Sequence, residues 1–434
     1  MIQTIDLRGQ TGTRAEWAAR LPRPAVDVDA ALPVVHALLD DVRARGSAAL
    51  AEQADRFDGG RPASLRVPAE ELAAAAAGLP TELAAAIRTA IDRVRLATAA
   101  QVPSPATTVL GEGARVTQRW QPVSRVGLYV PGGRAVYPSS VIMNVVPAQV
   151  AGVRGIALAS PPQRDAGHGV HPTILAVAHL LGVDEVYAMG GAGAIGAFAY
   201  GVPDAGIGPV DIVTGPGNVY VAAAKRAVRG VVGIDSEAGP TEILVIADAS
   251  ADPALVAADL ISQAEHDDAA ASVLVTDDPV LAARVSDELG RRAPLTLHAQ
   301  RVLTALSGPQ SAIVLVDDES AAVAVSNAYG PEHLELHTAD PRATLEGITD
   351  AGAIFLGPHS PVSLGDYLAG SNHVLPTGGQ ARFSSGLSAA TFLRPQQIVD
   401  YDRQGLREVA DALVAFAEAE GLPAHGEAAS VRFG

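Results

Sequence analysis

Two residues near position 265 have the types and the spacing of a metal site. Gln263 and His266 are three positions apart in a segment with helical periodicity, so their side chains would lie on one helix face, one turn apart. An amide oxygen and an imidazole nitrogen can hold one metal ion from such a face. The alternative is an ordinary polar helix end, because Glu265, Asp267 and Asp268 crowd the same stretch.

A second candidate is the pair Glu332 and His333, which follows Gly330 and Pro331 in an expected turn between a helix and a strand. A histidine with an ordinary pKa titrates near neutrality, so it can accept a proton and return it. Beside a carboxylate on a rigid turn it could serve general acid–base catalysis. The alternative is a solvated turn with no chemical role.

Two further polar groups lie towards the C-terminus. A loop after the last expected strand holds Asp366, Ser371, Asn372 and His373 between glycines, and functional and structural interpretations of it are balanced. His425 follows the last expected helix, where a histidine is usually solvated. Because the chain has no cysteine, any metal would have only nitrogen and oxygen ligands, a set that suits zinc, manganese or cobalt.

Glycine-rich turns mark possible ligand contacts with the backbone. Residues 191–196 have the form G-x-G-x-x-G after an expected strand and open an expected helix, whose free N–H groups could hold a phosphate. In a dinucleotide-binding fold an acidic residue should end the next strand, yet Asp211 begins it. The alternative, tight strand-to-helix packing, is therefore favoured. A second glycine turn, 215–218, could also bring the backbone close to a ligand.

The composition limits the class of protein. With 434 residues and 48% hydrophobic content, the chain predicts two or three domains with substantial cores. The absence of cysteine excludes disulfide scaffolds and a cysteine nucleophile. A net charge of -17 argues against a nucleic-acid partner. Neither a secretory leader nor a run of ~18 apolar residues is visible, so we expect a cytoplasmic protein with no membrane partner.

From residue 125 onwards, short apolar runs alternate with helical segments, which predicts the α/β class with two doubly wound, incomplete Rossmann-like parallel sheets. The expected strands are 126–130, 155–159, 185–189, 211–214, 231–234, 242–247, 272–276, 312–316, 334–337 and 353–356. Helical segments are expected within 1–60, over 69–100 with a break at Pro80, and over 406–421, followed by a short extended tail over 423–434. Glycine and proline cluster where the strands end, which is where open parallel sheets place their ligands.

Six segments, taken in order, carry a specific resemblance to a known family. They are VGLYVPGG at 126–133, TGPGN at 214–218, AGPTE at 238–242, SQAEH at 262–266, YGPEH at 329–333 and GSNHVLPT at 370–377. From about residue 30 to the C-terminus the chain resembles histidinol dehydrogenase. Segments of this length are far more specific than a single short motif.

The resemblance implies an NAD-dependent enzyme that oxidises L-histidinol to L-histidine through an aldehyde kept in the site, the last step of histidine biosynthesis. It implies one zinc ion per subunit, which orients the substrate. Glu332 and His333 match the family's acid–base pair, with His333 as general base and Glu332 activating water. It also implies a homodimer with shared active sites, completed by the C-terminal tail of the other chain. The implied zinc ligands are Gln263, His266, Asp366 and His425.

The resemblance also implies the contacts with substrate and cofactor. The substrate-binding positions are Thr241, Gln263, His266, His333, Asp366, His373, Glu420 and His425, and the NAD-binding positions are Tyr129, Gly193 and Asn218. The chain departs from the family twice. Thr241 replaces the usual serine but keeps the hydroxyl. Gly193 replaces the usual glutamine, so either backbone and water replace that contact with NAD or the affinity for NAD falls.

We expect four regions in the chain. These are an N-terminal arm over 1–28, an α/β domain over 29–134 and 243–385 that carries the metal and acid–base residues, a second Rossmann-like domain over 135–242, and a helical tail over 386–434 that is exchanged between subunits. Two other functions remain open: a metal-dependent hydrolase that uses Glu332 and His333 on a water without NAD, and a two-lobed binding protein with no turnover.

Overall fold

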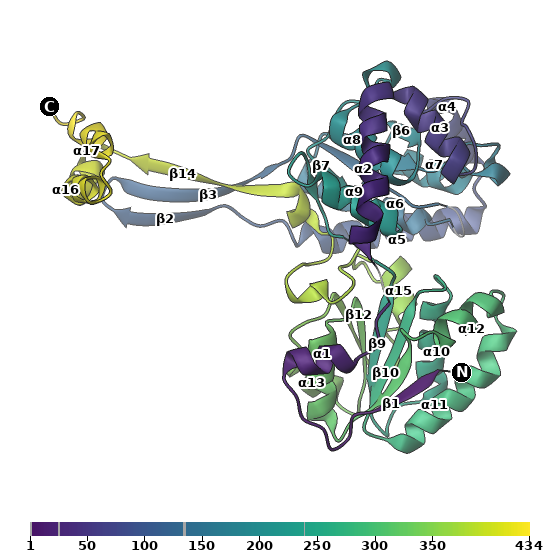
Figure 1. The fold of residues 1–434 in the computed structure, drawn as a ribbon. Helices are drawn as coiled ribbons and strands as arrows, with labels where there is room; N and C mark the ends of the chain where they lie inside the picture. Colours follow the sequence, from purple (N-terminus) through teal and green to yellow (C-terminus); the bar gives the residue numbers. More distant parts are fainter. Residues whose placement is uncertain (1, 25–26, 133–135, 238) are drawn as a thin grey trace.

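The computed structural model describes residues 2–24, 27–132, 136–237 and 239–434. Two α/β lobes meet end to end, and a long antiparallel ribbon projects from one of them to a pair of helices at the C-terminus (Figure 1). Gly133 and Ala238, which belong to two of the motifs above, lie outside the described residues, as does the expected domain boundary between 134 and 135.

In the described part of the chain, six parallel strands form the sheet of the first lobe, in the order β1-β11-β10-β9-β12-β13. β9 and β10 are buried along their whole length, because helices cover both faces of the sheet. Helices α10, α11 and α12 cover one face, and α1 and α13 cover the other. The strands are β1 (Gln3–Asp6), β9 (Glu242–Ala247), β10 (Ala271–Thr276), β11 (Ala312–Leu315), β12 (His333–His337) and β13 (Ala353–Leu356). The helices are α1 (Arg14–Arg20), α10 (Pro253–Ala264), α11 (Pro279–Arg292), α12 (Ala299–Ser307), α13 (Glu319–Tyr329), α14 (Pro341–Glu346) and α15 (Val362–Tyr367).

The second lobe has a five-stranded parallel sheet in the order β6-β5-β4-β7-β8. Its strands are β4 (Arg125–Tyr129), β5 (Gly155–Ser160), β6 (Val186–Ala188), β7 (Ile212–Thr214) and β8 (Gly233–Ile234). In each lobe the chain builds three strands outward in one direction and then returns to the other side of the first strand, with β1 added at the edge of the first lobe. The direction reverses between β4 and β7 and between β9 and β12. The prediction of two doubly wound parallel sheets is confirmed.

The four helices between residues 28 and 99 pack on the second lobe, which corrects the expected division of the chain. We expected 29–134 to share a domain with 243–385, but α2 packs on α8 and α9, α4 on α7, and α5 on α6. The apolar faces of α2 and α3 join one core with α8, so their burial depends on the five-stranded sheet. The expected arm over 1–28 instead contributes an edge strand and a packed helix to the first lobe. The helices of the second lobe are α2 (Val28–Arg45), α3 (Ser47–Phe57), α4 (Ala69–Ala77), α5 (Thr81–Ala99), α6 (Pro138–Ala151), α7 (Pro172–Leu180), α8 (Gly191–Tyr200) and α9 (Val219–Val228).

The projecting ribbon is a three-stranded antiparallel sheet that the sequence analysis missed. It contains β2 (Ala106–Gly111), β3 (Ala114–Pro122) and β14 (Leu393–Tyr401), in the order β14-β3-β2. At its end α16 (Arg403–Ala419) packs against α17 (Pro423–Ser430) (Figure 1). The expectation of an extended tail over 423–434 was wrong, because Pro423 occupies the first position of a helix, where its missing N–H costs nothing.

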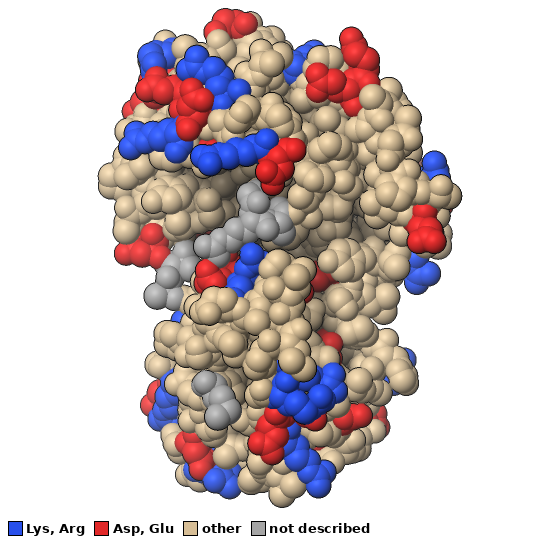
Figure 2. Space-filling model, turned by 90° about the vertical axis from the view of Figure 1, so that its right-hand side faces the viewer, with Lys and Arg blue, Asp and Glu red and all other residues tan. Residues whose placement is uncertain are grey.

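Both signs of charge occur on each lobe on the face that Figure 2 shows. On the face in Figure 2, Lys and Arg side chains alternate with Asp and Glu side chains. Among the described residues, we find no helix that combines the length and the apolar character needed to span a bilayer.

Candidate active site

Several predicted site residues meet at the amino edge of the six-stranded sheet, between β9 and β12. Thr241 immediately precedes β9, Glu332 precedes β12, and His333 begins β12. Helix α10 runs back across the sheet, so Gln263 near its end and His266 just beyond it reach the same edge. The expectation that ligand groups gather where strands end is therefore wrong for this lobe.

A chain of hydrogen bonds joins three of these side chains. Gln263 Nε2 donates to Thr241 Oγ1 over 2.8 Å, and Thr241 Oγ1 donates to Glu332 Oε2 over 2.6 Å. The backbone N–H of Glu242 donates to the same oxygen of Glu332 over 2.9 Å. Glu332 is only 6% exposed, and this burial raises the pKa of its carboxyl to about 8 in spite of the two donors.

His333 is buried beside Glu332 and is held by one of its two ring nitrogens. Its Nδ1 lies 3.2 Å from the carbonyl oxygen of Glu242 and 3.5 Å from Glu332 Oε2. Because a carbonyl can only accept, Nδ1 carries the hydrogen and Nε2 keeps a free lone pair. Nε2 has no hydrogen-bond partner among the described residues. Burial lowers the pKa of His333, so the imidazole is neutral and ready to accept a proton.

Asp366, in α15, brings two more histidines to the site. His266 Nδ1 faces the carbonyl oxygens of Ser262 and Gln263, at 3.1 and 3.2 Å, so Nε2 points outwards and lies 3.9 Å from Asp366 Oδ2. His373 Nδ1 lies 3.1 Å from the carbonyl oxygen of Asp366. His373 Nε2 lies 3.1 Å from the hydroxyl of Ser140, in α6 of the second lobe. The site therefore lies where the two lobes touch.

Three of the four predicted metal ligands converge in a single chain. Gln263 is 2% exposed, and its Oε1 has no hydrogen-bond partner among the described residues. A buried acceptor without a donor costs about 1–3 kcal/mol unless a ligand satisfies it. Together with His266 Nε2 and the carboxylate of Asp366, this oxygen forms a nitrogen and oxygen donor set that fits zinc.

Glu420 and His425 lie elsewhere in the chain. Glu420 caps the end of α16, His425 is in α17, and both are exposed. These helices lie at the far end of the β2-β3-β14 ribbon (Figure 1). Within one chain, the structure thus does not bring these two residues to the other site residues.

The predicted NAD-binding positions lie at the carboxyl edge of the five-stranded sheet, where its strand order reverses. Tyr129 ends β4, and its hydroxyl accepts a hydrogen bond of 3.2 Å from the backbone N–H of Gly191 at the start of α8. Asn218 follows β7, and its side chain caps α9 by accepting from the N–H groups of Tyr220 and Val221. Open α/β sheets bind ligands at such a reversal.

Gly193 is buried between helices. A Cβ atom at this position would lie 2.6 Å from Oε1 of Gln53 and 3.2 Å from a methyl group of Leu50, both on α3. A Cβ at Gly196 would similarly lie 2.8 Å from a methyl group of Leu39. These glycines let α8 approach α2 and α3 closely, as in the packing alternative for the G-x-G-x-x-G segment. A role of Gly193 towards NAD stays a prediction.

We expect Gly193→Ala to be destabilising only while Gln53 is present. Overpacking costs typically 1–3 kcal/mol, whereas alanine gains roughly 0.5–1 kcal/mol over glycine within a helix. The free energy of unfolding should therefore fall by about 1 kcal/mol in the wild-type background and stay level or rise in a Gln53→Ala background. Urea unfolding of the four proteins measures this. Equal effects of Gly193→Ala in both backgrounds would refute the contact.

Glu242 is a buried site residue that the sequence analysis did not single out. It has no exposed surface, and burial raises its pKa to about 7, while Arg23 opposes this shift. Arg23 Nη1 lies 3.2 Å from one carboxylate oxygen, the Tyr329 hydroxyl donates to that oxygen over 3.3 Å, and the N–H of Gly378 donates to the other over 3.1 Å. An acidic residue at the head of the apolar strand EILVIA was the available signal.

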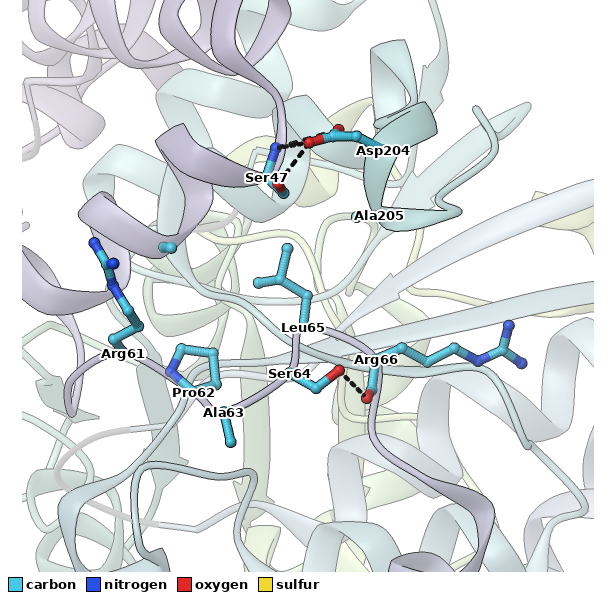
Figure 3. A pocket seen from close by; sticks show the side chains of 10 residues that line it. Ser47, Arg61, Pro62, Ala63, Ser64, Leu65, Arg66, Asp204 and Ala205 are labelled. Atoms are coloured by element: carbon cyan, nitrogen blue, oxygen red, sulfur yellow. Dashed lines mark hydrogen bonds between the residues drawn. The ribbon is translucent and has the colours of Figure 1, made fainter.

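A cavity of about 410 Å³ lies away from these residues, between α3 and the loop before α4. Ser47 binds Asp204 at one end of it, while Arg61 and Arg66 extend in different directions (Figure 3). Arg61 is paired with Asp55 at 3.2 Å. None of the described residues that line this cavity belongs to the candidate active site.

Comparison with known proteins gives a consistent family. The family model described as histidinol dehydrogenase matches residues 21–433. A histidinol dehydrogenase of Leifsonia xyli subsp. xyli is 67% identical, over 100% of this chain and 99% of its own length. One from Thermobifida fusca is 59% identical, over 100% and 98%. A crystal structure of histidinol dehydrogenase from Elizabethkingia anophelis is 35% identical, covers 99% of this chain and 98% of its own, and superposes with a TM-score of 0.92.

Proposed function

The chain belongs to the histidinol dehydrogenase family, and from this we propose that it oxidises L-histidinol to L-histidine in two NAD-dependent steps, the last reaction of histidine biosynthesis. The observation that supports the proposal best is the meeting of Gln263, His266 and Asp366 beside the buried pair Glu332 and His333. Metal donors next to an acid–base pair are what an oxidation of an imidazole-bearing amino alcohol requires.

Zinc would be held by Gln263, His266 and Asp366 of one chain and by His425 of a second copy. When bound, zinc acts as a Lewis acid and orients the substrate through its nitrogen atoms. The chain's own part is to supply neutral and anionic donors at fixed positions. His266 is fixed by the bonds of its Nδ1 to backbone carbonyls, which leaves Nε2 for the metal.

His333 acts as the general base in both oxidations. In the first, Nε2 takes the proton of the substrate hydroxyl while the hydride of the same carbon passes to NAD, which leaves the aldehyde. In the second, Nε2 takes a hydroxyl proton from the aldehyde hydrate while a second hydride passes to NAD, which leaves the carboxylic acid. Because Nδ1 keeps its own hydrogen on the Glu242 carbonyl, Nε2 is the nitrogen that accepts the proton in each step, and it releases the first proton to solvent before the second oxidation.

Glu332 forms the hydrate between the two oxidations. Its carboxylate takes a proton from water as the water oxygen adds to the aldehyde carbon, and the former carbonyl oxygen then receives that proton, which completes the hydrate. The donors from Thr241 and from the Glu242 backbone hold the carboxylate in place beside His333. We assign the remaining substrate contacts to His373 and Thr241 of the same chain and to Glu420 of the second copy.

The second lobe binds NAD at the reversal of its strand order, near Tyr129 and Asn218. Since His373 already contacts Ser140 of α6, the touching faces of the two lobes can bring the cofactor to the substrate. Gly193 offers no side chain to NAD, so either backbone groups and water take that part or the affinity for NAD falls.

The rate of the second oxidation should rise with pH through about 8. Because burial raises the pKa of Glu332 to about 8, most Glu332 carboxyl groups in a sample are protonated at neutral pH and cannot accept a proton from water. His333 does not limit the rate there, because burial lowers its pKa. The measurement is kcat with L-histidinal and NAD across this range, and Glu332→Gln should lack the rise. A flat wild-type profile would contradict the assignment of Glu332.

Absorbance of reduced nicotinamide tests the proposed function directly. Purified protein mixed with zinc, NAD and a limiting amount of L-histidinol should produce two NADH for each L-histidinol consumed. A hydrolase would act without NAD, and a binding protein would give no signal. One NADH per L-histidinol would leave only an alcohol dehydrogenase and reject the second oxidation.

A further inference from the structure

A second group of metal-ligating side chains lies in the first lobe, apart from the candidate active site. Glu335 and His337 are two positions apart in β12, so they point to the same face of the sheet. Helix α10 covers this face, and its residue Asp259 completes the group. We call these three residues the inner triad.

The three side chains approach one another at distances that suit a shared ligand. His337 Nε2 lies 3.4 Å from Glu335 Oε2 and 3.8 Å from Asp259 Oδ2. One ligand atom from each residue lies within 4.8 Å of both others. Zinc held at about 2.1 Å by tetrahedral ligands sets those ligands roughly 3.4 Å apart. The inner triad therefore needs only small movements to surround an ion.

Two of these atoms are buried and form no hydrogen bond, although they lie 3.4 Å from each other. Glu335 has no exposed surface and His337 is 5% exposed. Glu335 Oε1 accepts from the N–H of Val362 over 2.8 Å, but Glu335 Oε2 and His337 Nε2 have no hydrogen-bond partner among the described residues. Leaving buried acceptor atoms without a donor is costly, so a ligand with positive charge is expected between them.

We propose that the inner triad binds a divalent transition-metal ion, such as zinc, through Asp259 Oδ2, Glu335 Oε2 and His337 Nε2. Two carboxylates and one imidazole form a nitrogen and oxygen set that suits zinc or manganese. Asp259 is the least buried member, with 14% of its side chain exposed, and it gives the ion a route to solvent. Water would complete the coordination from that side.

The inner triad shares no side chain with the candidate active site, although it lies on the same two elements. Asp259 is four positions before Gln263 on α10, and His337 is four positions after His333 on β12. The ion would therefore tie α10 to β12 one helical turn behind the ligands and the base of the active site. We infer that the ion stabilises the packing of α10 on β12, which positions Gln263 and His333.

Zinc content per chain tests the proposal. Protein stripped with a chelator, reloaded with zinc and desalted should hold two ions per chain in the wild type, by elemental mass spectrometry. His266→Ala, which removes an active-site ligand, should hold one ion. The double variant Glu335→Gln, His337→Gln should also hold one, and its combination with His266→Ala should hold none. Zinc should raise the Tm of His266→Ala and leave that of the combined variant unchanged.

The outcomes separate this proposal from the proposed function. A His266→Ala chain without zinc overturns the inner triad as a metal site, and the buried groups then share a proton instead. If the wild type holds only one ion, and if only the inner-triad variants lose that ion, the result would support the inner triad and reject the active-site zinc. If the double variant does not fold, Asp259→Asn in the His266→Ala background decides, because that ligand is partly exposed. Retention of its ion would overturn the proposal.

Discussion

His333→Ala should lower kcat by about 10²–10⁴-fold while zinc stays bound. The side chain has one free nitrogen, Nε2, in a buried site where water cannot easily replace it. In the proposed mechanism the same base serves both oxidations, so both steps should be slowed. The variant also leaves Gln263, His266 and Asp366 untouched, so the zinc content should equal that of the wild type.

The matched control for this prediction is His359→Ala, which removes an exposed histidine of the same lobe. It should keep wild-type kcat and zinc content. His333→Gln adds a second comparison, because the glutamine side chain can fill the space of the imidazole but cannot accept a proton. Wild-type turnover in either His333 variant would end the assignment of the general base.

His425→Ala should remove the active-site zinc and the activity together, although the residue is exposed in this chain and lies in α17, at the end of the ribbon. Loss of a group that only supports a ligand typically costs 10–100-fold in metal affinity, so loss of a ligand should cost more than about 100-fold. Zinc titration measures the affinity. The control is Glu427→Ala, an exposed neighbour on α17, which should bind zinc normally. Unchanged zinc affinity in His425→Ala would show that His425 is not the fourth zinc ligand.

Much of the fold could be predicted because the strands and helices of each lobe have regular local sequence patterns. Runs such as EILVIA and ASVLVT are mostly apolar, as is typical of strands buried on both faces, and helices separate them. The ribbon was missed for the opposite reason. β14 is mostly exposed and polar, so it has no clear periodicity, and its pairing with β3 spans more than 270 residues.

Segment order also misled the division into domains. Helices α2 to α5 are followed by β2, β3 and then β4, and their partners α6 to α9 lie just beyond β4. Only the packing of apolar faces shows that they cover the five-stranded sheet. The tail over 423–434 was expected to be extended because Gly421 followed by Pro423 is a stop signal for the preceding helix, but Pro423 instead takes the first position of a new helix.

The candidate site shows a different limit. Spacing placed Gln263 and His266 on one face, and the turn paired Glu332 with His333, but sequence alone could not show that these groups meet. They meet because α10 returns to the amino edge, where β9 and β12 begin side by side. Glu242 escaped notice because its importance comes from burial beside Arg23 and Tyr329, which are distant in sequence.

Mixing two inactive variants tests most directly whether each active site is built from two chains. His266→Ala and His425→Ala chains should each be inactive alone. After they are unfolded together in equal amounts and refolded, half of the dimers should be hybrids, each with one intact site, so activity should return to about a quarter of the wild-type level. The active-site zinc should return in the same proportion. Activity that stays at zero after mixing, with refolded wild type as the control, would contradict a site shared between chains.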